Sequence, residues 1–188
     1  MIKNIIIIFI SYFIGTISLA RIIANIQNID LKSKGTKNPG ATNVYRLVSP
    51  KWGILTGAID FFKGFIPVYI VKELLNYDWV IIIAVSVAAV AGHNWPFQYN
   101  FNGGRGLATS MGTLGAVSFV LGLISFIIGG LILWIIRKHS NKDWRIPYFV
   151  YPVFVIITIN FNYNINILIY VFFVLLIACL RGWQVKTR

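Results

Sequence analysis

The sequence predicts an all-α, polytopic membrane protein with about seven transmembrane helices and glycine-rich motif loops on the cytoplasmic side. One observation behind this is composition: of 188 residues, 57% are hydrophobic and 12% are charged, and the mean hydropathy is +0.76. Soluble domains carry about 25% charged residues, so this chain has too few polar side chains to cover a water-facing surface. The other is that the apolar residues form long runs, with the cations gathered between them.

The predicted transmembrane spans are apolar runs close to the roughly 20 residues that a helix needs to cross a bilayer. The first run has neither a basic start nor a small-residue cleavage site, so we expect it to be retained rather than removed as a signal peptide. The spans belong to one integral-membrane domain, 1–188, and cover residues 5–24, 53–72, 79–95, 107–121, 122–136, 147–159 and 165–180.

The fourth apolar run, Leu107–Ile136, is too long for one span. A single helix of that length would measure about 45 Å and tilt by about 50°, beyond the usual range of about 0–40°. We therefore expect a hairpin of two short spans, 107–121 and 122–136, that turns near Gly122 or Gly129–Gly130.

The charges predict the orientation of the chain in the membrane. There are 17 Lys and Arg against 5 Asp and Glu, which gives a net charge of +12. With the hairpin in place most of these cations share one side, which the positive-inside rule identifies as cytoplasmic. The N-terminus is then outside and the C-terminus cytoplasmic. We expect membrane lipids and no nucleic acid as partners, because a nucleic-acid-binding module carries its cations on a polar, soluble surface.

Two segments have the residue types that bind phosphate. In Lys34–Arg46, glycine, Asn and Pro favour tight turns, while hydroxyls, amides and cations can surround an oxyanion. The alternative for this segment is a turn-rich linker whose charges set the topology. Its candidate phosphate-binding residues are Thr36, Asn38, Gly40, Thr42, Asn43 and Arg46.

The second segment, Asn102–Thr109, places Gly103, Gly104 and Gly106 around Arg105, just before an expected helix start. There, backbone N–H groups and a guanidinium can approach the same phosphate. The segment is not a P-loop, because it lacks both the Gly-Lys-Ser/Thr ending and a preceding soluble strand.

Three further polar residues lie within or at the edge of predicted spans. His93 either orients a loop through hydrogen bonds or accepts a proton. Asp60 and Lys63, at positions i and i+3 of the second span, share a helix face and are expected to form a structural ion pair or to position substrate. With two His and one Cys in the whole chain, we expect no metal site.

Taken together, four segments resemble the bacterial PlsY family of integral-membrane acyl-phosphate:glycerol-3-phosphate acyltransferases. They are Gly35–Arg46, Asp60–Gly64, Gly92–Pro96 and Phe101–Thr109, in the family's order. The resemblance implies seven spans in the bacterial cytoplasmic membrane and no cofactor. It also implies transfer of a fatty acyl group from acyl phosphate to the sn-1 hydroxyl of glycerol 3-phosphate, which yields lysophosphatidic acid and phosphate.

The same resemblance assigns roles to particular residues. Thr36, Asn43 and Arg46 would hold phosphate from the first segment, and Arg105 would hold it from the second. Thr36 and His93 are the implied catalytic residues, with His93 positioning or deprotonating the attacking hydroxyl. A phosphate oxygen of the donor is the alternative acceptor for that proton.

The chain also departs from the family pattern. Thr36 replaces Ser and Arg105 replaces Lys, which keeps the hydroxyl and the charge, but Lys37 replaces a glycine that adopts positive φ freely. The family's C-terminal segment with Arg, His and Asn is absent before Arg181. Two other functions stay open: a noncatalytic lipid-binding or regulatory protein on this fold, and a small anion transporter. The sequence leaves acyl-chain preference and oligomeric state open, and a monomer is compatible with it.

Overall fold

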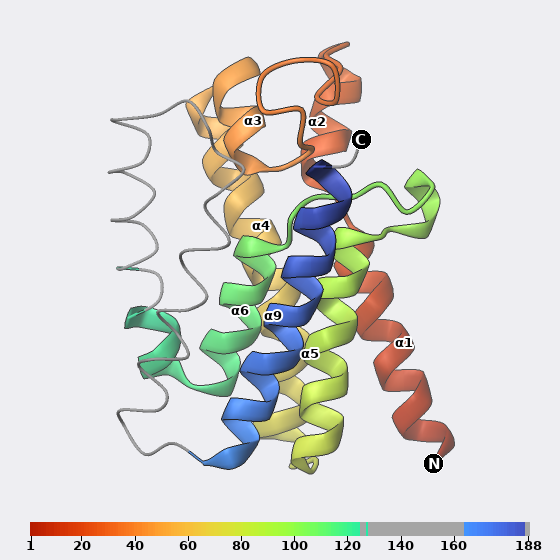
Figure 1. The fold of residues 1–188 in the computed structure, drawn as a ribbon, viewed down its shortest axis with the longest axis vertical. Coiled ribbons are helices and arrows are strands. Elements are labelled where there is room, and N and C mark those ends of the chain that lie inside the picture. Colours follow the sequence, from red (N-terminus) through yellow and green to blue (C-terminus); the bar gives the residue numbers. More distant parts are fainter. Residues whose placement is uncertain (125–126, 128–163, 187–188) are drawn as a thin grey trace.

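The computed structural model describes residues 1–124, 127 and 164–186, and all regular secondary structure in these ranges is helical (Figure 1). The all-α prediction is therefore confirmed for the described residues, whereas the predicted span 147–159 and most of 122–136 lie outside them. The elements are α1 (Ile2–Thr16), α2 (Leu19–Ile26), α3 (Ala41–Leu47), α4 (Pro50–Tyr69), the π-helix η1 (Ile70–Leu74), α5 (Trp79–Asn94), the 3-10 helix η2 (Phe97–Tyr99), α6 (Leu107–Val117) and α9 (Ile165–Lys186).

Three helical stretches of the described chain are long and apolar enough to cross a membrane: Ile2–Ile26, Pro50–Leu74 and Trp79–Tyr99. They correspond to the first three predicted spans. The second stretch begins before its predicted start because Ser49 Oγ accepts a hydrogen bond from Trp52 N at 3.3 Å and caps α4. It ends later because the helix passes through η1 after the internal Pro67, which has no N–H to donate.

The first spanning stretch is interrupted rather than continuous. Ile17 and Ser18 take extended backbone angles between α1 and α2, and this leaves carbonyl oxygens without helical partners. Two side chains from elsewhere supply the missing donors. Lys63 Nζ donates to Ile17 O at 2.7 Å, and Gln98 Nε2 donates to Thr16 O at 3.0 Å. The break therefore supplies a carbonyl oxygen that accepts a hydrogen bond from the buried side chain of Lys63.

Glycines bring the helices of the bundle into backbone contact. At Gly64 of α4 and Gly112 of α6, an added Cβ would lie 2.2 and 2.0 Å from a carbonyl oxygen of the other helix. Gly15 and Gly92 pair α1 with α5 in the same way. Small residues that allow such close approach are typical of helix packing in membranes, where van der Waals contact replaces the hydrophobic effect between helices.

The predicted hairpin turns earlier than expected. α6 ends at Val117, Ser118 is extended, and helical backbone resumes at residues 119–124. A Cβ on Gly122 would lie 2.4 Å from Gly115 Cα, so the chain folds back onto α6 directly after this break. The described chain thus turns at Ser118 instead of Gly122, and the alternative turn at Gly129–Gly130 lies outside the described residues. Ser118 Oγ accepts from Leu121 N at 3.4 Å as the new helix starts.

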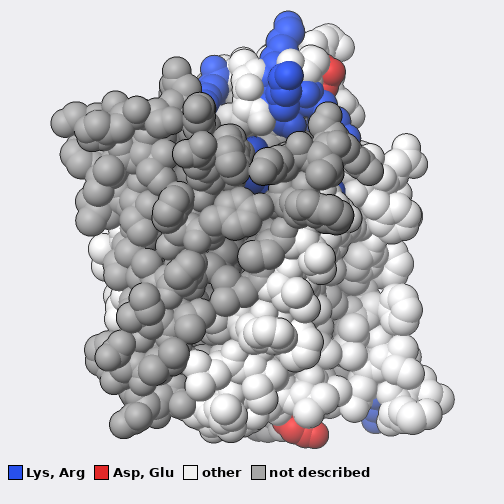
Figure 2. All heavy atoms as spheres, in the orientation of Figure 1, with Lys and Arg blue, Asp and Glu red and all other residues white. Residues whose placement is uncertain are grey.

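α9 completes the described bundle and runs past the predicted end of the last span at residue 180. Buried Tyr170 shares a 2.6 Å hydrogen bond with Thr113 Oγ1, which joins α9 to α6. The N-terminus lies at one end of the bundle, and both glycine-rich loops lie at the other, with the end of α9 (Figure 1). Figure 2 shows Lys and Arg side chains gathered mainly at this second end of the described surface.

Candidate active site

The first glycine-rich loop is organised by one buried amide. Asn43 is 0% exposed, and its Oδ1 accepts from Thr36 N at 2.8 Å. Its Nδ2 donates to Leu31 O at 2.8 Å and to Lys34 O at 3.1 Å. The oxygen and both amide hydrogens of Asn43 are therefore used inside the loop, where they hold its backbone in position. The resemblance had implied that this side chain holds phosphate.

Two residues of this loop have left-handed backbone angles, Gly35 with φ +61° and Lys37 with φ +54°. At Gly35 a Cβ would also lie 2.2 Å from Asn43 Oδ1, so glycine is required there. Lys37, which stands where the family pattern has glycine, adopts the left-handed conformation that glycine takes more easily, at a cost on the order of 1 kcal/mol. Its side chain is exposed, so it does not fill the interior of the loop.

The other candidates of the first loop lie around α3. Thr36 and Asn38 are half-buried, and within the described part of the chain the Thr36 hydroxyl makes no hydrogen bond. Gly40 precedes the first turn of α3, Thr42 is half-buried in that turn, and Arg46 is exposed in the last turn. Thr36 therefore keeps a hydroxyl available for a ligand.

The second loop uses its glycines differently from the prediction. Gly103 N donates to Asn94 O and Gly104 N donates to His93 O, each at 3.1 Å, so these amides satisfy the last carbonyls of α5. A Cβ would lie 2.0 Å from His93 O at Gly103 and 2.2 Å from His93 Nε2 at Gly104. In this structure both amides are engaged by α5, and the two glycines let the loop pack onto that helix; the phosphate-binding role expected of them stays a prediction. Arg105 follows half-buried, and Gly106, with φ +77°, starts α6.

Two arginines that the charge pattern had assigned to topology hold the carbonyl side of this loop. Arg181 of α9 is 5% exposed, and its guanidinium donates to Gly103 O at 2.7 Å and to Gly104 O at 3.1 Å. Arg21 of α2 donates to Asn102 O and lies over the Tyr99 ring, 4.2 Å from its centroid. Neither arginine was assigned a contact with this loop from the sequence alone. A signal was present, because Arg21 lies inside the first apolar run and Arg181 directly follows the last one, and a charge in such positions is costly unless it has a partner.

A buried ionic cluster lies beneath the second loop. Lys63 Nζ is 2.7 Å from Asp60 Oδ1, and the side chains of both residues are at most 5% exposed. His93 Nδ1 lies 3.4 Å from the same carboxylate oxygen, without the alignment of a hydrogen bond. Charges at this depth are retained only when they are paired, and here the helix break at Ile17 supplies a further acceptor.

The two ring nitrogens of His93 have different surroundings. Its Nδ1 lies 3.4 Å from Asp60 Oδ1, and its Nε2 lies beside Gly104, where an added Cβ would be 2.2 Å away. Its own carbonyl accepts from Gly104 N. His93 therefore lies between the buried ion pair and the second loop.

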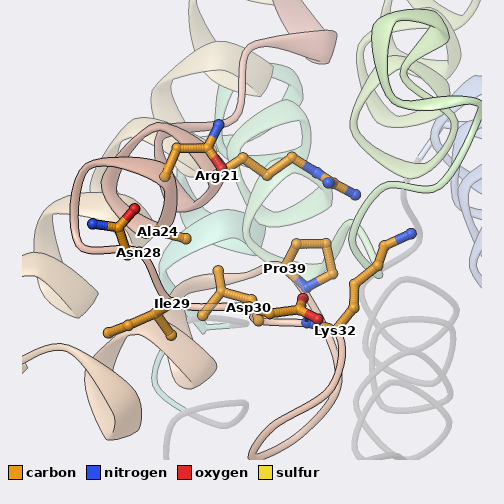
Figure 3. A pocket seen from close by; sticks show the side chains of 9 residues that line it. Arg21, Ala24, Asn28, Ile29, Asp30, Lys32 and Pro39 are labelled. Carbon is orange, nitrogen blue, oxygen red and sulfur yellow. Dashed lines mark hydrogen bonds between the residues drawn. The ribbon is translucent and has the colours of Figure 1, made fainter.

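A separate cavity of about 490 Å³ lies between α2 and the start of the first loop (Figure 3). Its described lining includes Arg21, Asp30, Lys32 and Pro39, and none of the candidate phosphate-binding residues. Figure 3 shows the Arg21 side chain extending away from Asn28 and Ile29. The candidate phosphate-binding side chains therefore lie outside the described lining of this cavity.

Comparisons with known proteins agree with this architecture. The sequence model of the family described as glycerol-3-phosphate acyltransferase matches residues 5–187. A glycerol-3-phosphate acyltransferase of Aquifex aeolicus is 37% identical over 133 residues, which is 70% of this chain and 69% of the relative. One from Ruthia magnifica is 37% identical over 155 residues, 80% of this chain and 76% of the relative.

Two solved structures are also similar. The crystal structure of PlsY, an integral membrane glycerol 3-phosphate acyltransferase, in its glycerol 3-phosphate form has a TM-score of 0.84 and 29% identity, covering 99% of this chain and 91% of that one. The lysophosphatidic acid form gives a TM-score of 0.82 and 28% identity, with the same shares covered.

Proposed function

The chain belongs to the glycerol-3-phosphate acyltransferase family, and we propose that it transfers a fatty acyl group from acyl phosphate to the sn-1 hydroxyl of glycerol 3-phosphate. It is a multi-pass membrane acyltransferase of phospholipid biosynthesis, with glycerol 3-phosphate as a substrate. The identity of the acyl donor and the roles of individual residues are the parts that we propose.

The observation that carries the proposal is that two cationic, glycine-rich loops from distant parts of the sequence share one end of the bundle (Figure 1). Two phosphate-bearing substrates need such cationic surroundings at the membrane surface, while the acyl chain needs contact with lipid. We assign phosphate binding to Thr36 and Arg46 in the first loop and to Arg105 in the second. Asn43, Gly103 and Gly104 hold the loops in place.

The proposed step is displacement at the acyl carbon. The glycerol hydroxyl oxygen forms a bond to that carbon, and the bond from the carbon to the phosphate oxygen breaks, releasing inorganic phosphate and lysophosphatidic acid. Acyl phosphate is a mixed anhydride with a good leaving group, so alignment and charge neutralisation supply much of the rate. Arg105 and Arg46 provide that neutralisation.

The hydroxyl proton goes to a phosphate oxygen of the donor in this scheme. The support for this choice is that His93 is 9% exposed and that its Nδ1 faces the Asp60 carboxylate. His93 and the Asp60–Lys63 pair then act as positioning residues. The Thr36 hydroxyl is available to donate a hydrogen bond to substrate phosphate.

We propose that both loops and the C-terminus face the cytoplasm of a bacterial cell, with the N-terminus outside. The support is the grouping of cations around the loops, which the positive-inside rule associates with the cytoplasmic face (Figure 2).

The test compares acyl donors with purified protein in detergent and glycerol 3-phosphate as acceptor. We expect phosphate release with acyl phosphate and no transfer from acyl-CoA. Arg105→Ala should lower turnover by about 1,000-fold or more, because it removes a charge placed at the reacting phosphate. Arg105→Lys, the matched control, keeps the charge and should retain most activity. Full activity of Arg105→Ala with an unchanged melting temperature would refute the phosphate role of Arg105.

A further inference from the structure

The second loop is fixed from both sides of its backbone. The N–H groups of Gly103 and Gly104 donate to α5, and their carbonyls accept from Arg181 of α9. These two carbonyls immediately precede Arg105 in the chain. The backbone that leads into Arg105 is therefore held by a contact between the loop and the C-terminal helix.

We propose that Arg181 is a positioning residue: its guanidinium, bonded to the carbonyls of Gly103 and Gly104, directs Arg105 toward the substrate phosphate. This inference rests on the phosphate-binding role proposed for Arg105. Arg181 itself touches protein groups and is not assigned a catalytic role.

The geometry requires an arginine. Nε donates to Gly104 O at 3.1 Å while Nη2 donates to Gly103 O at 2.7 Å, so a planar fork spans two successive carbonyls. A lysine ammonium is a compact donor that cannot reproduce this spacing. At 5% exposure the side chain has little water to compensate for a lost bond, and both carbonyls would stay unsatisfied without it.

A second contact holds the arginine. Arg181 Nη1 donates to Gln184 Oε1 at 3.3 Å, and Trp95 Nε1 donates to the same oxygen at 2.7 Å. Gln184 lies one turn further along α9, and Trp95 follows the end of α5. The last turns of α9 are therefore tied to the loop and to α5 together.

The first arm of the test measures binding of radiolabelled inorganic phosphate to the purified full chain in detergent. Four proteins form a cycle: wild type, Arg181→Gln, Arg105→Ala and the double variant. Arg181→Gln should weaken phosphate binding by about 10-fold in the wild-type background and by less than about twofold in the Arg105→Ala background, because it acts through Arg105. Arg181→Lys should restore part of the loss. Lys72→Gln, at the opposite end of the bundle, is the charge-matched control and should bind as wild type.

Equal losses in both backgrounds would overturn the proposal, since a general structural defect does not depend on Arg105. Wild-type affinity of Arg181→Gln would overturn it as well.

The second arm is independent of phosphate. Hydrogen–deuterium exchange of the peptide containing Gly103 and Gly104 should accelerate in Arg181→Gln, while peptides of α1 keep their wild-type rates. Unchanged exchange in that peptide would refute the contact. If wild type binds no phosphate and the exchange still responds, the proposed function and the link to Arg105 fail, while the contact itself stands.

Discussion

The two glycine-rich loops contain similar residues but are held in different ways. The first is organised from within, because the Asn43 side chain bonds to three backbone groups of its own segment. The second makes few such bonds and is fixed from outside, by the end of α5 and by Arg21 and Arg181.

This difference determines what each loop responds to. The first loop depends on local sequence and should form wherever its own residues are intact. The second loop is held by α2 near the start of the chain and by α9 at its end, so it takes this position only when these helices have packed together. An active site built between them would therefore be complete only in the folded membrane protein.

Among the changes that test how the two loops are held, the largest effect is expected at the internal support of the first loop. Asn43→Leu keeps the side-chain size but leaves Thr36 N–H and the carbonyls of Leu31 and Lys34 without partners, at a cost of about 3 kcal/mol. Acyl transfer should fall by about 100-fold or more, because the loop no longer holds Thr36 in place. Thermal unfolding and phosphate release measure the two effects. The control is Asn25→Leu, on the exposed side of α2. Equal behaviour of the two variants would contradict the internal support.

A smaller effect is expected where the second loop packs on α5. Gly104→Ala places a Cβ 2.2 Å from His93 Nε2, so the loop must shift, at a cost of about 2 kcal/mol. The matched control, Gly57→Ala, meets Ala41 Cβ at an ordinary 3.5 Å and lies inside α4, where it should be neutral or stabilising by up to about 1 kcal/mol. Melting temperatures in detergent distinguish them. A Gly104→Ala protein as stable and active as Gly57→Ala would show that the loop is not packed this closely.

The smallest effect is expected at the strained lysine of the first loop. Lys37→Gly removes the cost of a left-handed non-glycine residue and should stabilise the protein by at most about 1 kcal/mol. Because the side chain is exposed, acyl transfer should change by less than about twofold. A rise in melting temperature is the readout. A large loss of activity would mean that Lys37 itself contacts substrate.

Much of the fold follows from hydropathy, because membrane spans depend on the length of apolar runs. The first three predicted spans lie within the three long apolar helical stretches of the described residues. The break at Ile17–Ser18 was not predicted, since its carbonyls are satisfied by Lys63 and Gln98, which lie far away in the sequence. The turn at Ser118 was also missed, because close packing of Gly122 on Gly115 decides it.

The site was predicted at the level of segments rather than of contacts. Glycine, asparagine and arginine in a loop indicate a phosphate site, but they do not tell which groups face the ligand and which hold the backbone. The amides of Gly103 and Gly104 were expected to face phosphate and instead complete α5. Arg181 was counted only among the cations that set topology. Its partners are backbone carbonyls, which every residue has, so no residue type in the sequence indicates the contact.

The most direct test of the central claim is to quantify both products of one reaction. Purified protein receives glycerol 3-phosphate and acyl phosphates of several chain lengths, and lysophosphatidic acid and inorganic phosphate are measured together. We expect equal amounts of the two, with the acyl group on the sn-1 oxygen. Neither product above background at any chain length would contradict the claim and identify the chain as a noncatalytic relative. Phosphate without lysophosphatidic acid would indicate hydrolysis in place of transfer.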